Sequence, residues 1–156
     1  MYALRQWSVK NARPMRALYD GLEGILVKMH PLFEWLGYRR IDKFVLGIEK
    51  VSKRLLFDSL SCGQCILGST GMACPMNCPK SMRNGPCGGV RADGKCEVDP
   101  EMDCVWLLAW EGNKRLAEQS YPIQVVQPPV DNRLRNTSAW LREVRKLTNT
   151  QDENAR

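Results

Sequence analysis

All seven cysteines of this chain lie between Cys62 and Cys104, in one stretch rich in glycine and proline. The rest of the 156 residues contains none. Glycine and proline forbid long regular elements, and the stretch has little continuous apolar sequence from which a core could form. Thiols concentrated in this way usually hold metal, which then fixes the fold around them. Residues 59–120 are therefore predicted to form an irregular metal-binding core and the helix that follows it.

The cysteines include two close pairs. Cys62 and Cys65 are separated by two residues, and Cys74 and Cys78 by three, so each pair can direct two sulfurs at one metal centre. Pro79 follows directly and gives a Cys-Pro step like that of bacterial ferredoxin ligand runs. The remaining thiols are Cys87, Cys96 and Cys104.

Two metals compete for these thiols. Zinc takes four tetrahedral ligands, and the two close pairs would supply them. An iron–sulfur cube also takes four thiolates, but from a wider loop. Glycines beside the sulfurs let backbone N–H groups approach cluster sulfur, so we favour the cube over zinc.

The number of thiols is one short of the eight that two four-thiolate sites require. A second site would need a further ligand, and the candidates are Asp58, Asp99, Asp103, Ser59 or solvent. The alternative is one site only, with Cys87, Cys96 and Cys104 packed as small hydrophobic residues.

The sequence before the cysteines predicts helices in residues 1–58. Apolar residues recur at steps of three and four from Met15 to Met29 and again from Ile41 to Leu55, including Phe44, Val45, Ile48 and Val51. Pro31 and Gly37 should interrupt these helices. The two apolar faces are expected to be core or surface for a partner.

Local signals place further elements after the first cysteines. Asp93-Gly94 suits a tight turn, which predicts a short β-hairpin over residues 89–98. Asp99 followed by Pro100 predicts the start of a helix that reaches about residue 118. The overall class is therefore mainly α, with a helical N-terminal arm, the irregular core with its hairpin, and a C-terminal tail.

The tail, residues 121–156, should run extended over a surface and end in a short helix. Thr137 or Ser138 would cap that helix, and Trp140, Leu141 and Val144 form its apolar face. The surface beneath this tail is either the chain's own core or a partner. Trp7, Trp35, Trp106 and Trp140 are candidate anchors for a partner, or members of the core.

Charge and composition narrow the function classes. Lys and Arg exceed Asp and Glu by six, but the charges, Lys53 among them, are spread along helix faces that we expect to be solvated. No base-stacking strip accompanies them, so nucleic acid is not expected as a partner. The N-terminus lacks the apolar core of a secretory signal, and no apolar run approaches the ~20 residues that span a bilayer. We expect a cytoplasmic protein with reduced thiols, with no membrane partner and no complete active site.

The cysteine motifs resemble a known family. They read CGQC, CPMNCPKSMRNGPCGG, DGKCEV and CVW, followed by QPPVDNRL and NTSAWL. Over residues 58–142 the chain is similar to the C-terminal domain of methylenetetrahydrofolate reductases, which also occurs as a separate small subunit. The resemblance implies that all seven cysteines bind one or two [4Fe–4S] clusters, without assigning which thiols group together.

The resemblance also implies a partner, a flavin-bearing (β/α)₈-barrel methylenetetrahydrofolate reductase subunit that holds FMN or FAD. This chain is too short to contain such a barrel itself. The expected function is an iron–sulfur electron-transfer subunit in one-carbon, folate metabolism, passing electrons between an external donor protein and that flavin. The alternative is a zinc-bound structural subunit that assembles the reductase.

Overall fold

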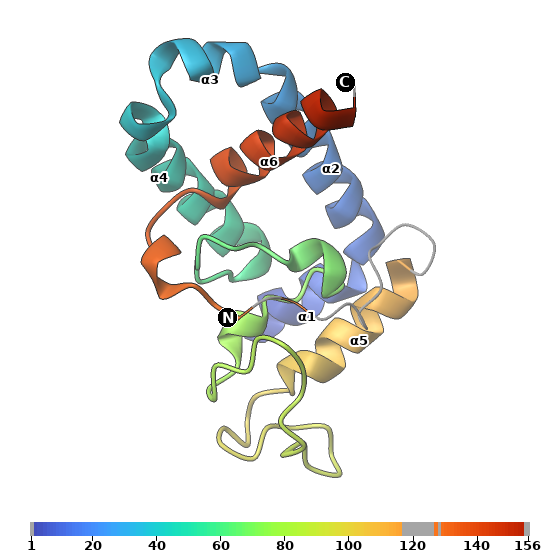
Figure 1. Cartoon of the computed structure of the whole chain (residues 1–156). Coiled ribbons are helices and arrows are strands. Elements are labelled where there is room, and N and C mark those ends of the chain that lie inside the picture. Colours follow the sequence, from blue (N-terminus) through green and yellow to red (C-terminus); the bar gives the residue numbers. More distant parts are fainter. Residues whose placement is uncertain (1, 117–126, 128, 155–156) are drawn as a thin grey trace.

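Helices form the frame of the protein, and loops carry its cysteines (Figure 1). The computed structural model describes residues 2–116, 127 and 129–154. The helices are α1 (Tyr2–Lys10), α2 (Ala12–Lys28), α3 (His30–Leu36), α4 (Tyr38–Phe57), α5 (Val105–Leu116) and α6 (Ala139–Asn154), with the short 3₁₀ turns η1 (Leu67–Ser69), η2 (Pro75–Asn77) and η3 (Asn132–Leu134). The predicted mainly helical class is confirmed.

Local sequence explains the breaks among the first four helices. Pro31 lies in the first turn of α3, where its missing N–H costs no helical hydrogen bond. Gly37 separates α3 from α4 with φ +81°, a conformation that favours glycine. Both predicted interruptions are confirmed.

The C-terminal helix packs on the chain's own helices. α2 and α4 diverge like the arms of a V, and α6 crosses between them and contacts both (Figure 1). Leu141 and Val144 of α6 form a buried cluster with Phe33 of α3. Ser138 caps the helix, since its Oγ accepts the N–H of Leu141 at 3.2 Å. The predicted tail helix and its cap are confirmed, and its apolar face is part of this core.

The predicted β-hairpin at residues 89–98 is wrong. The described part of the chain contains no β-strand, only isolated bridges between Val90 and Cys96 and between Lys95 and Asp103. A tight turn does form, because Gly94 N–H donates to the Arg91 carbonyl at 2.9 Å. The two arms are joined at one bridge, where Arg91 N–H donates to the Lys95 carbonyl at 2.8 Å and Glu97 N–H to the Gly89 carbonyl at 3.2 Å. The N–H of Cys96 faces the other way and donates to the Met102 carbonyl at 2.9 Å, and neither pairing extends into a ladder.

The helix predicted to start at Pro100 starts later. Asp99 and Pro100 form a turn, in which the Asp99 carboxylate accepts the N–H of Glu101 at 3.2 Å. α5 begins only at Val105, and Cys104 directly precedes it, with its carbonyl accepting the N–H of Leu108. Cys104 therefore lies directly before the first helical residue.

The extended tail falls partly outside the described residues, since residues 117–126 and 128 are not described. The described part from Pro129 onward leads through η3 to α6 and lies beside the first cysteine loop. No described helix combines the length and the apolar character needed to cross a bilayer.

Candidate metal centre

The first cysteine loop is fixed where it leaves α4. Asp58 ends the helix in a left-handed conformation with φ +51°. Its carboxylate is buried and accepts a hydrogen bond from Nε of Arg5 on α1 at 2.7 Å. Its carbonyl accepts Nδ2 of Asn77, from the second cysteine segment, at 2.9 Å. The direction of the loop is therefore set before the first cysteine.

The Cys62–Cys65 loop is clamped by the segment before α6. The amide of Gln64 pairs with the backbone of Asp131, donating to its carbonyl at 2.9 Å and accepting its N–H at 3.2 Å. Arg142 of α6 donates to the carbonyl of Gly63. A side chain at Gly63 would lie 2.1 Å from the Leu134 carbonyl oxygen, so only glycine fits there.

A second segment brings Cys74 beside the loop that carries Cys62 and Cys65. Thr70 closes the turn before it, because its hydroxyl, which has one proton to donate, lies 2.7 Å from the Ala73 carbonyl oxygen and 3.0 Å from that of Ile66. Cys74 is buried in a cluster that includes Phe57 and Leu67. This burial raises the pKa of its thiol, and a hydrogen bond with Ser59 opposes the rise.

Three of the seven thiols share one small cavity of about 20 Å³. Cys62, Cys65 and Cys74 line it, together with Glu49, Lys53 and Arg83. We call these three cysteines the near thiols. Cys65 and Cys74, nine positions apart in the sequence, thus line the same cavity. Contacts from α1, α4 and the segment before α6 hold the two cysteine loops against each other.

A buried ion pair stands beside the near thiols. Nζ of Lys53 bonds to Oε1 of Glu49 at 2.7 Å, and both side chains are at most 2% exposed. The other oxygen of Glu49 accepts the hydroxyl of Ser138 at 2.7 Å and the N–H of Trp140 at 3.3 Å. Glu49 thus stabilises the positive end of α6.

Lys53 also faces Cys65. Burial alone would lower the pKa of Lys53, but the Cys65 thiolate and Glu49 carboxylate outweigh it and raise that pKa. Burial raises the pKa of the Tyr19 hydroxyl as well, and neighbouring Cys65 adds to the rise. The raised pKa keeps Lys53 protonated, so a positive charge stands beside Cys65.

The other four thiols lie outside the shared cavity. Cys78 and Cys104 are half-buried, and Cys87 is exposed. Cys96 is buried against Met102 and Val105 in a separate cluster. All seven cysteines are free thiols, none in a disulfide.

The donor set of the cavity suits a thiolate-bound metal. Its three thiols lie beside the cation of Lys53, and its carboxylate, Glu49, is already engaged by that lysine. Among residues 2–116, 127 and 129–154, however, no three Cys, His, Asp or Glu side chains are gathered closely enough to hold one metal ion. The near thiols therefore meet at one place without the spacing of a closed single-ion site.

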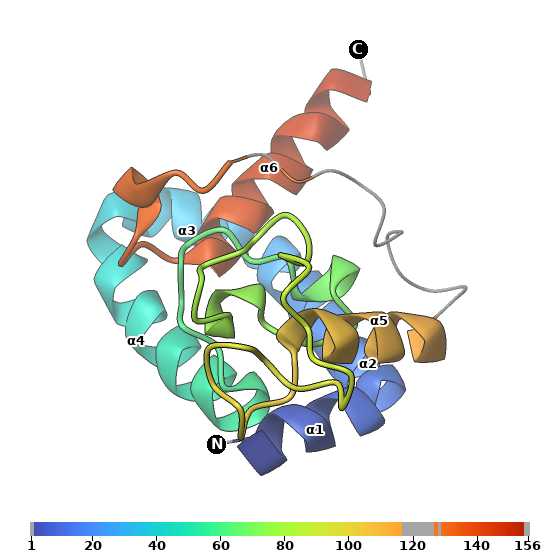
Figure 2. The same cartoon turned by 90° about the horizontal axis from the view of Figure 1, so that it is seen from below.

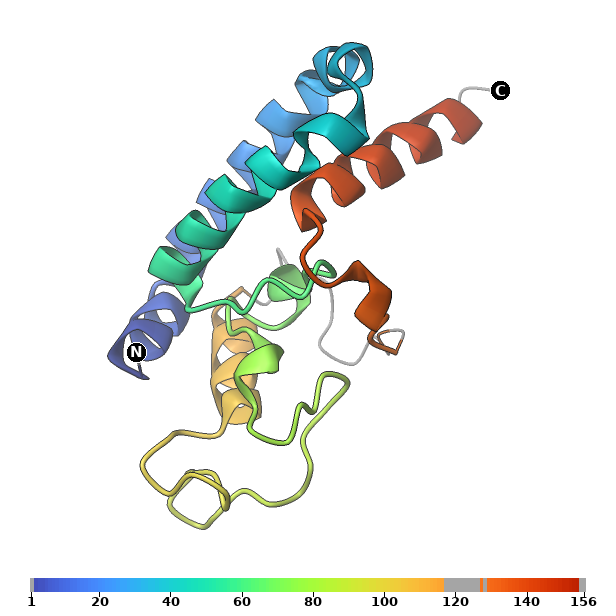
Figure 3. The ribbon, with the colours of Figure 1, turned by 90° about the vertical axis from the view of Figure 1, so that its left-hand side faces the viewer.

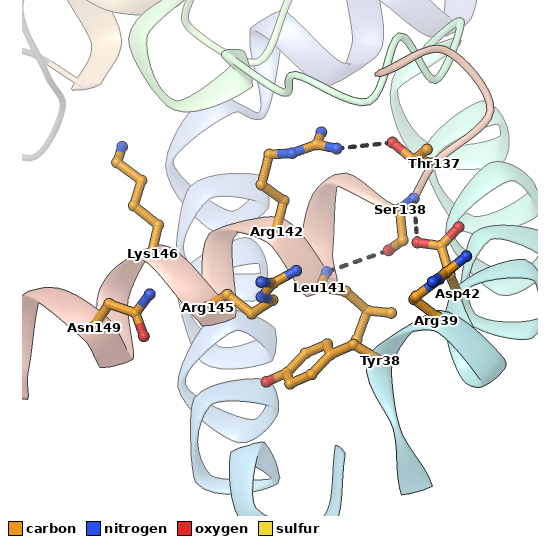
Figure 4. A pocket seen from close by; sticks show the side chains of 10 residues that line it. All are labelled: Tyr38, Arg39, Asp42, Thr137, Ser138, Leu141, Arg142, Arg145, Lys146 and Asn149. Carbon is orange, nitrogen blue, oxygen red and sulfur yellow. Dashed lines mark hydrogen bonds between the residues drawn. The ribbon is translucent and has the colours of Figure 1, made fainter. Parts of the chain in front are cut away.

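A larger cavity lies between α4 and α6, away from the cysteines (Figure 4). It measures about 530 Å³ and is lined by the cationic side chains of Arg39, Arg142, Arg145 and Lys146, with Asp42 as its carboxylate. Arg142 points from this cavity towards Thr137, to which it donates at 2.9 Å. The same side chain holds Gly63, so it connects the cationic cavity to the first cysteine loop.

The four candidate tryptophan anchors have different environments. Trp140 is buried, and Lys53 lies 5.4 Å from its ring centroid. Trp106 is half-buried and donates to the Met82 carbonyl at 2.8 Å. Trp7 and Trp35 are exposed, Trp35 by 81%. Two of the four are thus held by the chain's own structure.

Sequence reasoning missed the residues that support the near thiols. Lys53 counted among the solvated basic residues, yet it is buried. The four-residue spacing of Glu49 and Lys53 on an otherwise apolar helix face was the available signal. Gln64, Tyr19 and Arg142 gave no signal, because their partners are distant in the sequence.

Comparisons with known proteins bear on the family alone. The family described as "Methylene-tetrahydrofolate reductase C terminal" matches residues 38–133, which include all seven cysteines. The search of curated proteins and the search of solved structures gave no match. The matched region covers more than half of the chain, and the chain belongs to the methylenetetrahydrofolate reductase C-terminal family.

Proposed function

We propose that this protein is an accessory subunit of a methylenetetrahydrofolate reductase and that its cysteines hold one or two [4Fe–4S] clusters. The observation that carries the proposal is the cavity that Cys62, Cys65 and Cys74 line together. Family membership links the chain to the reductase. In this proposal a partner of the flavin-bearing barrel type holds the flavin and the folate.

The residues around the near thiols hold and polarise them. Gln64 and Arg142 fix the backbone between Cys62 and Cys65, and Lys53 places a positive charge beside Cys65. A bound cluster would supply one-electron storage at this point. Reduction of a methylene to a methyl group needs two electrons and two protons, and the electrons would come from an external low-potential donor protein.

Zinc is the second candidate metal, and cysteine spacing favours it. The Cys62/Cys65 and Cys74/Cys78 pairs have the two- and three-residue separations of zinc knuckles. In that case the chain would assemble the reductase without carrying electrons. The two candidates differ in colour, in sulfide content and in their response to reductant.

Oxygen-free purification of the chain together with its reductase tests the proposal. We expect iron and acid-labile sulfide in equal amounts, a broad visible absorption that dithionite bleaches, and reduction of the partner's flavin by a reduced ferredoxin only when this chain is present. The reductase alone is the control. Stoichiometric zinc in a colourless protein would replace the iron–sulfur proposal with the structural one, and absence of both metals would end both.

A further inference from the structure

Helix α4 is apolar on two opposite faces. Its inner face, which includes Leu46 and Phe57, is buried in the chain's own core. Its outer face carries four large apolar side chains that remain exposed. They are Phe44 (73% exposed), Ile48 (49%), Val51 (61%) and Leu55 (67%), and we call them the α4 seam.

The spacing of the seam is that of a helix-pairing surface. Its residues follow one another at steps of four, three and four, the spacing of the core positions of a heptad repeat. At 100° per residue they fall within one narrow stripe, on the side of α4 opposite Leu46, Glu49 and Lys53. A stripe of this width fits one partner helix, whereas a helix lying in a membrane surface presents a broader apolar face.

The charges beside the seam have one sign. Arg40, Lys43, Lys50 and Arg54 are exposed on α4. Both carboxylates of α4 are engaged inward, because Glu49 is buried with Lys53 and Asp42 accepts the N–H of Ser138 at 3.1 Å. In the heptad register Arg40 and Arg54 lie at flanking positions, where they would meet charges on a partner helix. Pairing of the seam with a second copy would bring these cations together, so the occupant should carry carboxylates.

We propose that the α4 seam is the surface on which an amphipathic helix of the reductase subunit docks, with Asp or Glu residues beside Arg40 and Arg54. This inference rests on the proposed function for the identity of the partner. It places the contact on the side of α4 that faces away from Lys53 and the near thiols.

Binding of the full-length, metal-loaded chain to the reductase of the same organism tests the proposal. The double variant Phe44→Glu/Leu55→Glu should weaken binding at least thirtyfold, about 2 kcal/mol, because it puts two carboxylates into an apolar, acid-flanked contact. The matched control is Leu18→Glu on α2, where an apolar side chain 53% exposed lies away from α4; its affinity should be unchanged. Arg40→Glu/Arg54→Glu should weaken binding at low salt, and the difference should shrink as salt rises.

Iron and sulfide content and thermal unfolding, measured for every variant, separate this inference from the proposed function. Seam variants that keep their metal and their fold but bind the reductase like the wild type would overturn the docking surface alone. A wild-type chain that dimerises through the seam, or that binds vesicles of anionic lipid through it, would overturn it as well. A wild-type chain that contains iron but does not bind the reductase would overturn both the partner and the surface. If the wild type purified without oxygen contains no iron and yet binds the reductase through the seam, only the iron–sulfur proposal is overturned.

Discussion

The loop that carries Cys62 and Cys65 and the loop that carries Cys87 and Cys96 differ in what holds them. The first is fixed by contacts from α1, α4, α6 and the segment before α6. Residues 84–98, which we call the far loop, extend away from the helices (Figure 3) and bond among themselves, to Lys80 and to residues 101–104. Seen from below, the cysteine-bearing loops spread between α4 and α5 (Figure 2).

This difference indicates that the two cysteine loops depend on different interactions for their structure. The near thiols are positioned by packing and by hydrogen bonds from several separate elements. The far loop is bonded to neighbouring loop residues instead, and it contains glycines at positions 85, 88 and 89. We therefore expect metal binding, if it includes Cys87, Cys96 and Cys104, to stabilise the far loop more than the near one.

Metal removal should produce the largest effect. When a chelator strips the chain under anaerobic conditions, amides of residues 84–98 should lose protection from hydrogen exchange by at least about a hundredfold, because site formation contributes much of their stability. Amides of α4 and α6 should change far less. Hydrogen exchange would be measured by mass spectrometry. An equal loss of amide protection in residues 84–98 and in the two helices would show that the helical frame depends on metal as well.

Breaking the buried ion pair should produce the next effect. Lys53→Met leaves Glu49 buried without its cation, at a cost of about 3–5 kcal/mol in the free energy of unfolding. Glu49→Gln/Lys53→Met should recover part of this loss, since no lone charge remains buried. Lys50→Met, on the exposed side of α4, is the control and should cost less than about 1 kcal/mol. Denaturant unfolding of the metal-free chains measures all three, and equal losses for Lys53→Met and Lys50→Met would contradict the account.

Two glycines with the same backbone conformation compare the loops directly. Gly63 and Gly88 both have φ +77°, but a side chain at Gly63 would strike the Leu134 carbonyl, whereas the space around Gly88 is open. Gly88→Ala should cost only the strain of a left-handed residue, about 1–2 kcal/mol. Gly63→Ala should cost more, on the order of 3 kcal/mol, because the backbone must also shift. If thermal unfolding finds equal costs, the clamp on the first loop is weaker than described.

A smaller effect concerns pH and lies in the helical frame. Burial raises the pKa of Glu23 above its ordinary value near 4.5, and Glu143 and Asp20 add to the rise. The folded state then holds this proton more tightly than the unfolded state, so unfolding stability falls as pH rises through that pKa and stays lower at neutral pH. Glu23→Gln should stabilise the chain at pH 7 by no more than about 1 kcal/mol, and leave it unchanged near pH 3. A variant less stable than the wild type at pH 7 would refute this.

The sequence was sufficient to predict the features that depend on neighbouring residues. Gly37 ends one helix and Ser138 caps another, because a positive φ and a hydroxyl cap are local requirements. The apolar period of α4 predicted the helix correctly. It did not separate Val45, which packs inward, from Phe44, which is exposed, since both fit a helical step.

The features that depend on residues distant in the sequence could not be predicted from local patterns. The hairpin prediction failed because the two arms pair at the single Val90–Cys96 bridge, after which the chain folds back towards Met102 instead of extending a strand. Lys53 was assigned to the surface because a single lysine gives no sign that Glu49, Cys65 and Trp140 will surround it. The grouping of Cys74 with Cys62 and Cys65 depends on how their loops pack, which spacing alone does not determine.

The most direct test of the central claim compares metal content in Cys65→Ala and in the wild type, both purified without oxygen. Cys65 shares its cavity with Cys62 and Cys74, so the account predicts a folded variant that has lost at least one cluster's share of iron and sulfide. A wild type that contains iron, with a Cys65→Ala variant that retains all of it, would contradict the claim that the near thiols hold the metal.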